Sequence, residues 1–164
     1  MASGRVFDPL VLLRVAPVIS SSFSLWHCVS QHLFLNNLIV PEHRNKGNDI
    51  LPSYWRTFFQ PGLGVIFSLY GLSAGFALAN LYSANSPGAV SRWYKFGVLF
   101  TAAHFTFVPA VAKVIKSIVD GDGKEDTWKF QKKWLKIHAV RSVLVDFSGW
   151  LCFLAAATES LTVV

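Results

Sequence analysis

An ionisable pair stands inside an apolar stretch near the end of the chain. Asp146 lies in the run SVLVDFSGWLCFLAAA, five residues after Arg141. The run is apolar enough to cross a membrane, where an ionised carboxylate costs about 3 kcal/mol unless it is paired or faces a wet cavity. Asp146 is therefore the predicted centre of the functional site, as a general acid or base, with Arg141 beside it.

Three polar positions form one stripe on this predicted helix. His138, Ser142 and Asp146 are spaced four residues apart, so they share a helical face, and Arg141 lies about 60° to one side. A base, a hydroxyl, an acid and a fixed cation on adjoining faces suit proton-transfer chemistry. The alternative interpretation is structural, namely an Arg–Asp ion pair that fixes the register of the helix.

The first apolar stretch carries two histidines. His27 and Gln31 share one helical face, and His32 lies on the neighbouring face. We expect His27 or His138 to be the partner of Asp146, and His32 and Gln31 to contact substrate. The alternative is that these side chains only form hydrogen bonds between helices, worth about 1 kcal/mol each.

Three further side chains are predicted to contact substrate. Tyr70 lies in the second apolar stretch, His104 lies in the third stretch shortly before Pro109, and Ser142 lies beside Asp146. Each could line the same cavity, although such residues are more often packing residues.

The sequence carries no motif for a metal or a cofactor. His27 and His32 are five residues apart, so they do not share a face as ligands four residues apart would. There is no HExxH motif, no Glu-x-x-His pair and no glycine-rich phosphate-binding fingerprint. Cys28 and Cys152 are interpreted as small hydrophobic residues. We therefore predict neither a cofactor nor a metal.

Four apolar stretches must position these groups. The chain has 164 residues, of which 52% are hydrophobic and 15% charged, against about 25% charged in soluble domains. Each stretch supplies the roughly 20 residues that a membrane-spanning helix needs. The stretches run from about 10–40, 58–82, 96–118 and 137–163.

Short polar connections join these stretches over residues 41–56, 83–92 and 120–133. Because short connections make antiparallel neighbours, we predict an all-α, integral membrane, up-down-up-down four-helix bundle. A single domain would cover residues 1–164. The small residues Gly71 and Gly75 in GLSAG predict a close helix contact.

The charge pattern predicts the surroundings of the chain. The net charge is +6, but the basic residues avoid the apolar stretches and gather in the connections, which favours an anionic leaflet over nucleic acid as the partner. The positive-inside rule places the connections 41–56 and 120–133 in the cytoplasm. We therefore expect a protein of the endoplasmic reticulum membrane with both termini in the lumen. The expected partners are the bilayer, a lipophilic small-molecule substrate and a second copy of the chain in a homo-oligomer.

Three segments together resemble a known family. They are SYWRTFFQPG before the second stretch, HFTFVPAV in the third, and WLKIHAVRSVLVDF leading into the fourth. Their order and spacing are similar to those of the small four-helix integral membrane proteins that include the fungal anthrone oxygenases and related polyketide-tailoring epoxide hydrolases and cyclases. The resemblance covers most of the chain and implies a role in secondary metabolite biosynthesis.

This chain departs from the oxygenases by added ionisable groups. His138 stands where they carry Asn, Asp146 falls in a stretch that is apolar in them, and His27 and His32 lie in a helix that is rich in Gly and Ser in them. Oxygenation of an acidic anthrone needs mainly a base, whereas opening an epoxide needs an acid at the leaving oxygen and a base at the nucleophile.

We therefore expect cofactor-free acid–base epoxide opening, by a hydrolase or a cyclase, on a lipophilic polyketide-like intermediate, with Asp146 as the central acid or base. One alternative is an anthrone-type cofactor-free oxygenase. The other is a non-enzymatic membrane scaffold for a biosynthetic pathway.

Overall fold

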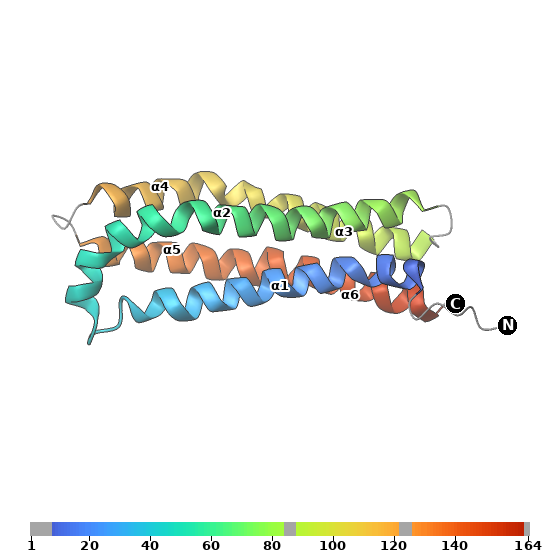
Figure 1. Cartoon of the computed structure of the whole chain (residues 1–164), viewed down its shortest axis with the longest axis horizontal. Helices are drawn as coiled ribbons and strands as arrows, with labels where there is room; N and C mark the ends of the chain where they lie inside the picture. Colours follow the sequence, from blue (N-terminus) through green and yellow to red (C-terminus); the bar gives the residue numbers. More distant parts are fainter. Residues whose placement is uncertain (1–7, 84–87, 122–125, 163–164) are drawn as a thin grey trace.

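The computed structural model consists of four antiparallel helical rods (Figure 1). It describes residues 8–83, 88–121 and 126–162, and within these ranges it contains helices and no strand. The rods are α1 (Pro9–Asn37), α2 (Arg44–Tyr82), α3 (Gly88–His104) with α4 (Val108–Asp120), and α5 (Thr127–Arg141) with α6 (Phe147–Thr162).

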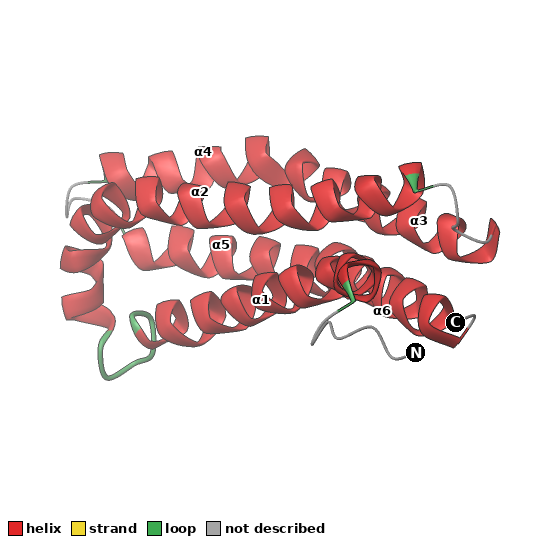
Figure 2. Ribbon diagram, turned by 45° about the vertical axis from the view of Figure 1, so that its right-hand side comes forward, coloured by secondary structure: helices red, strands yellow, loops and turns green. Residues whose placement is uncertain are grey.

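Each rod runs opposite to the one before it, and loops are confined to the ends of the bundle (Figures 1 and 2). All four rods are long and apolar enough to cross a membrane, so their length and composition suggest a multi-pass membrane protein. The predicted all-α class and four-helix bundle are confirmed.

The helices extend beyond the apolar stretches. α2 begins at Arg44 and α5 begins at Thr127, although the sequence predicts connections over 41–56 and 120–133. The side chain of Asn48 joins the two helices, because its Oδ1 accepts hydrogen bonds from the Thr127 hydroxyl at 2.6 Å and from the Trp128 N–H at 3.3 Å. Asn48 thereby satisfies a backbone donor that the first turn of α5 would leave unpaired.

Two clusters of buried apolar residues hold the rods together, one toward each end of the bundle. The first is centred on Leu51, Trp55, Ile118 and Trp134. The second is centred on Ala77, Tyr94, Phe153 and Ala156. On each rod the stretch between these two clusters carries polar side chains. We call this middle part of the bundle the polar level.

A close helix contact joins α3 and α6. A Cβ at Gly97 would overlap the ring of Phe153, and a Cβ at Gly149 would lie 3.1 Å from Cβ of Phe100. Glycine allows this approach because it has no side chain, as is usual where membrane helices pack closely. The predicted contact at Gly71 and Gly75 is wrong within the chain, since a Cβ at either position meets nothing within 4 Å.

Two irregular turns face the polar level. Between α3 and α4, Phe105–Phe107 form a 3-10 turn, η1. Between α5 and α6, Ser142–Asp146 form a π-helical turn, η2, in which the N–H of Phe147 bonds to the carbonyl of Ser142. Such turns are frequent at functional sites because they re-aim the neighbouring side chains.

Candidate functional site

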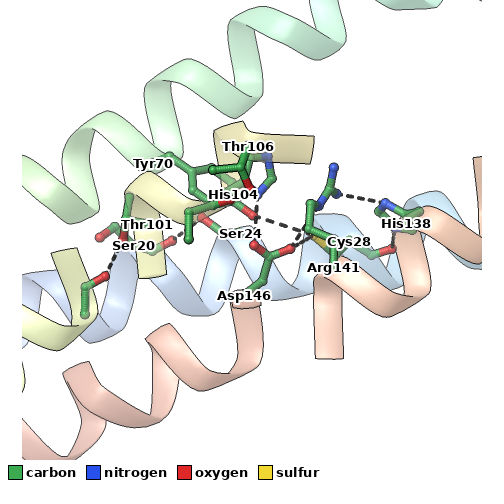
Figure 3. Close-up of polar contacts among 12 residues, drawn as sticks. Ser20, Ser24, Cys28, Tyr70, Thr101, His104, Thr106, His138, Arg141 and Asp146 are labelled. Carbon is green, nitrogen blue, oxygen red and sulfur yellow. Dashed lines mark hydrogen bonds and ion pairs between the residues drawn. The ribbon is translucent and has the colours of Figure 1, made fainter. Parts of the chain in front are cut away.

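Asp146 and His104 form a hydrogen-bonded pair in the middle of the bundle (Figure 3). His104 Nδ1 lies 2.8 Å from Asp146 Oδ1, and the side chains are 3% and 2% exposed. His104 is the last residue of α3, and Asp146 is the last residue of η2, so the two irregular turns bring the pair together. A carboxylate that accepts the Nδ1 hydrogen leaves Nε2 of the imidazole as the proton acceptor.

The second carboxylate oxygen of Asp146 also accepts hydrogen bonds. Arg141 Nε lies 3.4 Å from Asp146 Oδ2, and the thiol of Cys28 donates to the same oxygen at 3.5 Å. Three donors therefore surround Asp146, which stabilises its ionised form. The predicted pairing of Arg141 with Asp146 is present in the structure.

His138 holds Arg141 in place. Its Nδ1 lies 2.9 Å from Arg141 Nη2, and its Nε2 lies 2.9 Å from the carbonyl oxygen of Cys28. Because the guanidinium can only donate, Nδ1 of His138 accepts and Nε2–H donates to the carbonyl. Both nitrogens are thus committed to structural hydrogen bonds, and the ring also stacks on Trp134 with centroids 4.6 Å apart.

The histidine partner of Asp146 differs from the one predicted. The sequence predicts His27 or His138, whereas the structure places His104 against the carboxylate. The Nε2 atom of His27 is enclosed and has no hydrogen bond to the described residues. His32 is half-buried and stacks on His138 with centroids 6.3 Å apart. The hydroxyl of Ser142 is enclosed and, like His27 Nε2, unpaired within the described residues.

Tyr70 closes the other side of the pair. Its ring centroid lies 4.0 Å from that of His104, and its hydroxyl lies 3.9 Å from the Cys28 sulfur. A small space of about 20 Å³ adjoins Tyr70, Ser24, Thr101 and Asp146. That volume is sufficient for one water molecule, because the hydroxyl and carboxylate oxygens supply polar partners.

A larger cavity of about 230 Å³ lies on the side of His104 that faces α2 and α4. Aromatic and aliphatic side chains form most of its wall, among them Trp55, Phe58 and Phe67. Three predicted site residues, Gln31, His104 and Arg141, also line it, whereas Asp146, His27, His138 and Ser142 are not among its lining residues. An apolar pocket with a few convergent polar groups is the usual form of a small-molecule site.

This arrangement can transfer protons to and from a lipophilic molecule. Within the described residues, Nε2 of His104 has no hydrogen-bond partner, and His104 lines the cavity. Asp146 orients the ring and stabilises the imidazolium that forms when Nε2 takes a proton, which is how a carboxylate assists a catalytic histidine.

The residue that sequence reasoning missed is Cys28, which was interpreted as a hydrophobic residue but donates to Asp146. Its position three residues before Gln31 on the polar side of α1 is the available signal. No group of three or more His, Cys, Asp or Glu side chains gathers as a metal site in the part of the chain that the structure describes.

Known relatives cover almost the whole chain. The probable epoxidase scpX of Mollisia scopiformis is 31% identical over 92% of this chain and 96% of its own length. The epoxidase pydX of an Acremonium species and the epoxidase gkaX of Penicillium citrinum are each 28% identical over 93% of this chain and 96% of their own lengths. No family model matches the chain, and no solved structure matches it. The likeness of length and sequence shows that the chain belongs to the family of these epoxidases, and its four-helix structure fits the family resemblance seen in the sequence.

Proposed function

We propose that the chain is a tailoring enzyme of secondary metabolism that forms an epoxide on a lipophilic intermediate, with His104 as the proton-transfer residue and Asp146 as its positioning residue. The observation that carries the proposal is the pairing of His104 with Asp146 at the edge of an apolar cavity. The names of the three relatives support epoxide formation as the reaction.

When O2 forms an epoxide, the fate of both oxygen atoms must be accounted for. One atom adds across the C=C bond to form the epoxide ring. The other is either reduced to water by two electrons and two protons, or it is inserted into a C–H bond of the same substrate as a hydroxyl group. The second route fits this site better, because a base alone can start it by ionising an acidic C–H or O–H group. His104 Nε2 is placed to be that base.

The second candidate is epoxide opening, which is the reaction expected from the sequence. It is supported by the acid–base character of the site, since the protonated His104 could donate to the leaving oxygen while water or a substrate hydroxyl attacks. In both reactions His104 contacts the substrate, and Asp146 acts through His104 because both its oxygens already accept hydrogen bonds.

Oxygen isotopes distinguish these candidates. The gene is deleted in the producing organism, the intermediate that accumulates is isolated, and it is incubated with microsomes that contain the wild-type chain. Label from oxygen-18 gas in the epoxide ring is the expected result. Label from oxygen-18 water in a diol would instead establish ring opening, and a cyclic ether without either label would establish cyclisation by a substrate hydroxyl. An unchanged intermediate in the presence of folded chain would contradict both reactions and favour a scaffold.

A further inference from the structure

The cavity beside His104 is apolar along most of its wall but also has polar side chains in its lining. Phe58, Phe67 and Val111 are typical of the apolar wall, and Gln31, Arg141 and His104 are the residues that can offer hydrogen bonds. The contrast between these two kinds of lining indicates a ligand that is itself mostly apolar and carries a polar group.

The Gln31 amide makes no hydrogen bond to the residues that the structure describes. The residue is 7% exposed and lines the cavity. Buried amides are almost always hydrogen-bonded, so an unpaired one that borders a cavity points to a partner supplied by a ligand.

Arg141 offers a second donor to the same cavity. Its Nε bonds to Asp146 and its Nη2 bonds to His138, while Nη1 has no partner among the described residues. The guanidinium is a donor only, so whatever it binds in the cavity must be an acceptor. Because Asp146 already balances the charge of Arg141, that acceptor can be neutral and can gain negative charge during a reaction.

We propose that Gln31 and Arg141 form an oxygen-binding subsite that holds a carbonyl or enol oxygen of the substrate. The substrate class is then a lipophilic ketone or enol, whose apolar part occupies the aromatic wall. The cavity of about 230 Å³ exceeds the roughly 150 Å³ that holds benzene, so it accepts at least a bicyclic portion. A hydrocarbon without an oxygen acceptor would leave both donors unpaired, and an ammonium group would face the guanidinium.

The subsite deepens the proposed function and rests on it for its chemistry. A proton taken from an enol by His104 leaves an oxyanion, and donors aimed at that oxygen stabilise it. The same donors would stabilise the alkoxide formed when an epoxide opens. Gln31 and Arg141 would thus bind the oxygen at which charge develops, whereas His104 moves the proton.

The experiment compares two probes that differ by one carbonyl group. The purified full chain in detergent micelles is titrated with α-tetralone and with tetralin, and binding is measured by calorimetry. We expect α-tetralone to bind about tenfold more tightly, which corresponds to about 1.4 kcal/mol from the hydrogen bonds of Gln31 and Arg141 together. In Gln31→Leu the preference should fall to threefold or less, and the fold should persist because the amide makes no internal hydrogen bond.

Gln60→Leu is the matched control, because Gln60 is exposed on α2 and does not line the cavity. Its preference for α-tetralone over tetralin should equal that of the wild type. Because both probes partition into the micelles in the same way with either variant, comparing the two variants removes the effect of partition. The infrared band of carbonyl-labelled α-tetralone should shift to lower frequency on binding to the wild type and return toward its free value in Gln31→Leu. Equal binding of both probes to the wild type, or an undiminished preference in Gln31→Leu, would overturn the subsite.

These measurements require no turnover. A carbonyl preference without any epoxide chemistry would retain the subsite and remove the proposed reaction. Epoxide formation in the isotope experiment without a carbonyl preference would retain the reaction and remove the subsite.

Discussion

Arg141 Nε lies 3.4 Å from Asp146 Oδ2 although five residues separate the two positions along the chain. In a regular α-helix, residues five apart point about 140° away from each other. The π-helical turn Ser142–Asp146 reduces this angle, since its hydrogen bond spans five residues instead of four. The ion pair therefore depends on an irregular turn, and that turn ends at the residue that contacts His104.

The charge balance of this pair predicts the effect of Asp146→Asn. The variant leaves Arg141 as a buried charge without a counter-ion, which costs about 3–5 kcal/mol. We expect a clearly lower thermal unfolding temperature in detergent and loss of turnover of the isolated intermediate. Turnover is lost because Asp146 positions the base, His104.

The double variant Asp146→Asn with Arg141→Gln is the control for that prediction. It removes both charges, so its unfolding temperature should recover much of the loss while its activity stays absent. If the single variant were as stable as the wild type, Asp146 would not be the counter-ion of Arg141.

His104→Gln tests the identity of the base. Glutamine can keep a donor near Asp146 but cannot take up a proton, so we expect turnover to fall by about 10²- to 10⁴-fold. The preference for α-tetralone should be retained, since the subsite donors are unchanged. Product formation and calorimetry on one preparation check the two expectations together.

His43→Gln is the control, because His43 is exposed at the start of α2 and should keep full activity. If His104→Gln remained active and His27→Gln were inactive, the base would be His27, one of the two histidines predicted from the sequence.

Gly97→Ala tests the contact between α3 and α6. The added methyl group would overlap the Phe153 ring, and overpacking of this kind costs about 1–3 kcal/mol. Gly75→Ala is the matched control, since nothing lies within 4 Å of its Cβ and alanine is favoured over glycine within a helix by up to about 1 kcal/mol. Thermal unfolding of both variants in the same detergent gives the comparison. A destabilised Gly75→Ala with an unaffected Gly97→Ala would show that the second copy expected from the sequence packs at GLSAG.

The sequence predicts the bundle because apolar length and helical spacing are properties of one segment at a time. It also singles out Asp146 and Arg141, since opposite charges in an apolar helix are conspicuous. It does not identify His104 as the partner of Asp146, because that contact depends on the rotation and height of one rod against another. Periodicity within a rod carries no information about either quantity.

The π-helical turn is hidden from the sequence for a related reason. SVLVD contains neither proline nor glycine, and its residues are compatible with a regular α-helix. The available signal is the five-residue spacing of two residues that need to meet. A regular helix would place His138, Ser142 and Asp146 on one stripe, whereas the turn aligns Arg141 with Asp146 and separates His138 from direct contact with the carboxylate.

The orientation of the bundle gives the last prediction. Because the four rods are antiparallel, the start of α1 and the end of α6 lie at one end of the bundle (Figure 1). The basic residues Arg44, Lys46, Lys129 and Lys132 lie toward the other end, where α2 and α5 begin. Because positively charged connections stay in the cytoplasm, we expect epitope tags at both termini to face the lumen of the endoplasmic reticulum. In sealed microsomes both tags should resist added protease until detergent is present. Digestion of either tag while a lumenal marker protein stays intact would reverse the orientation, and digestion of one tag alone would contradict an even number of membrane crossings.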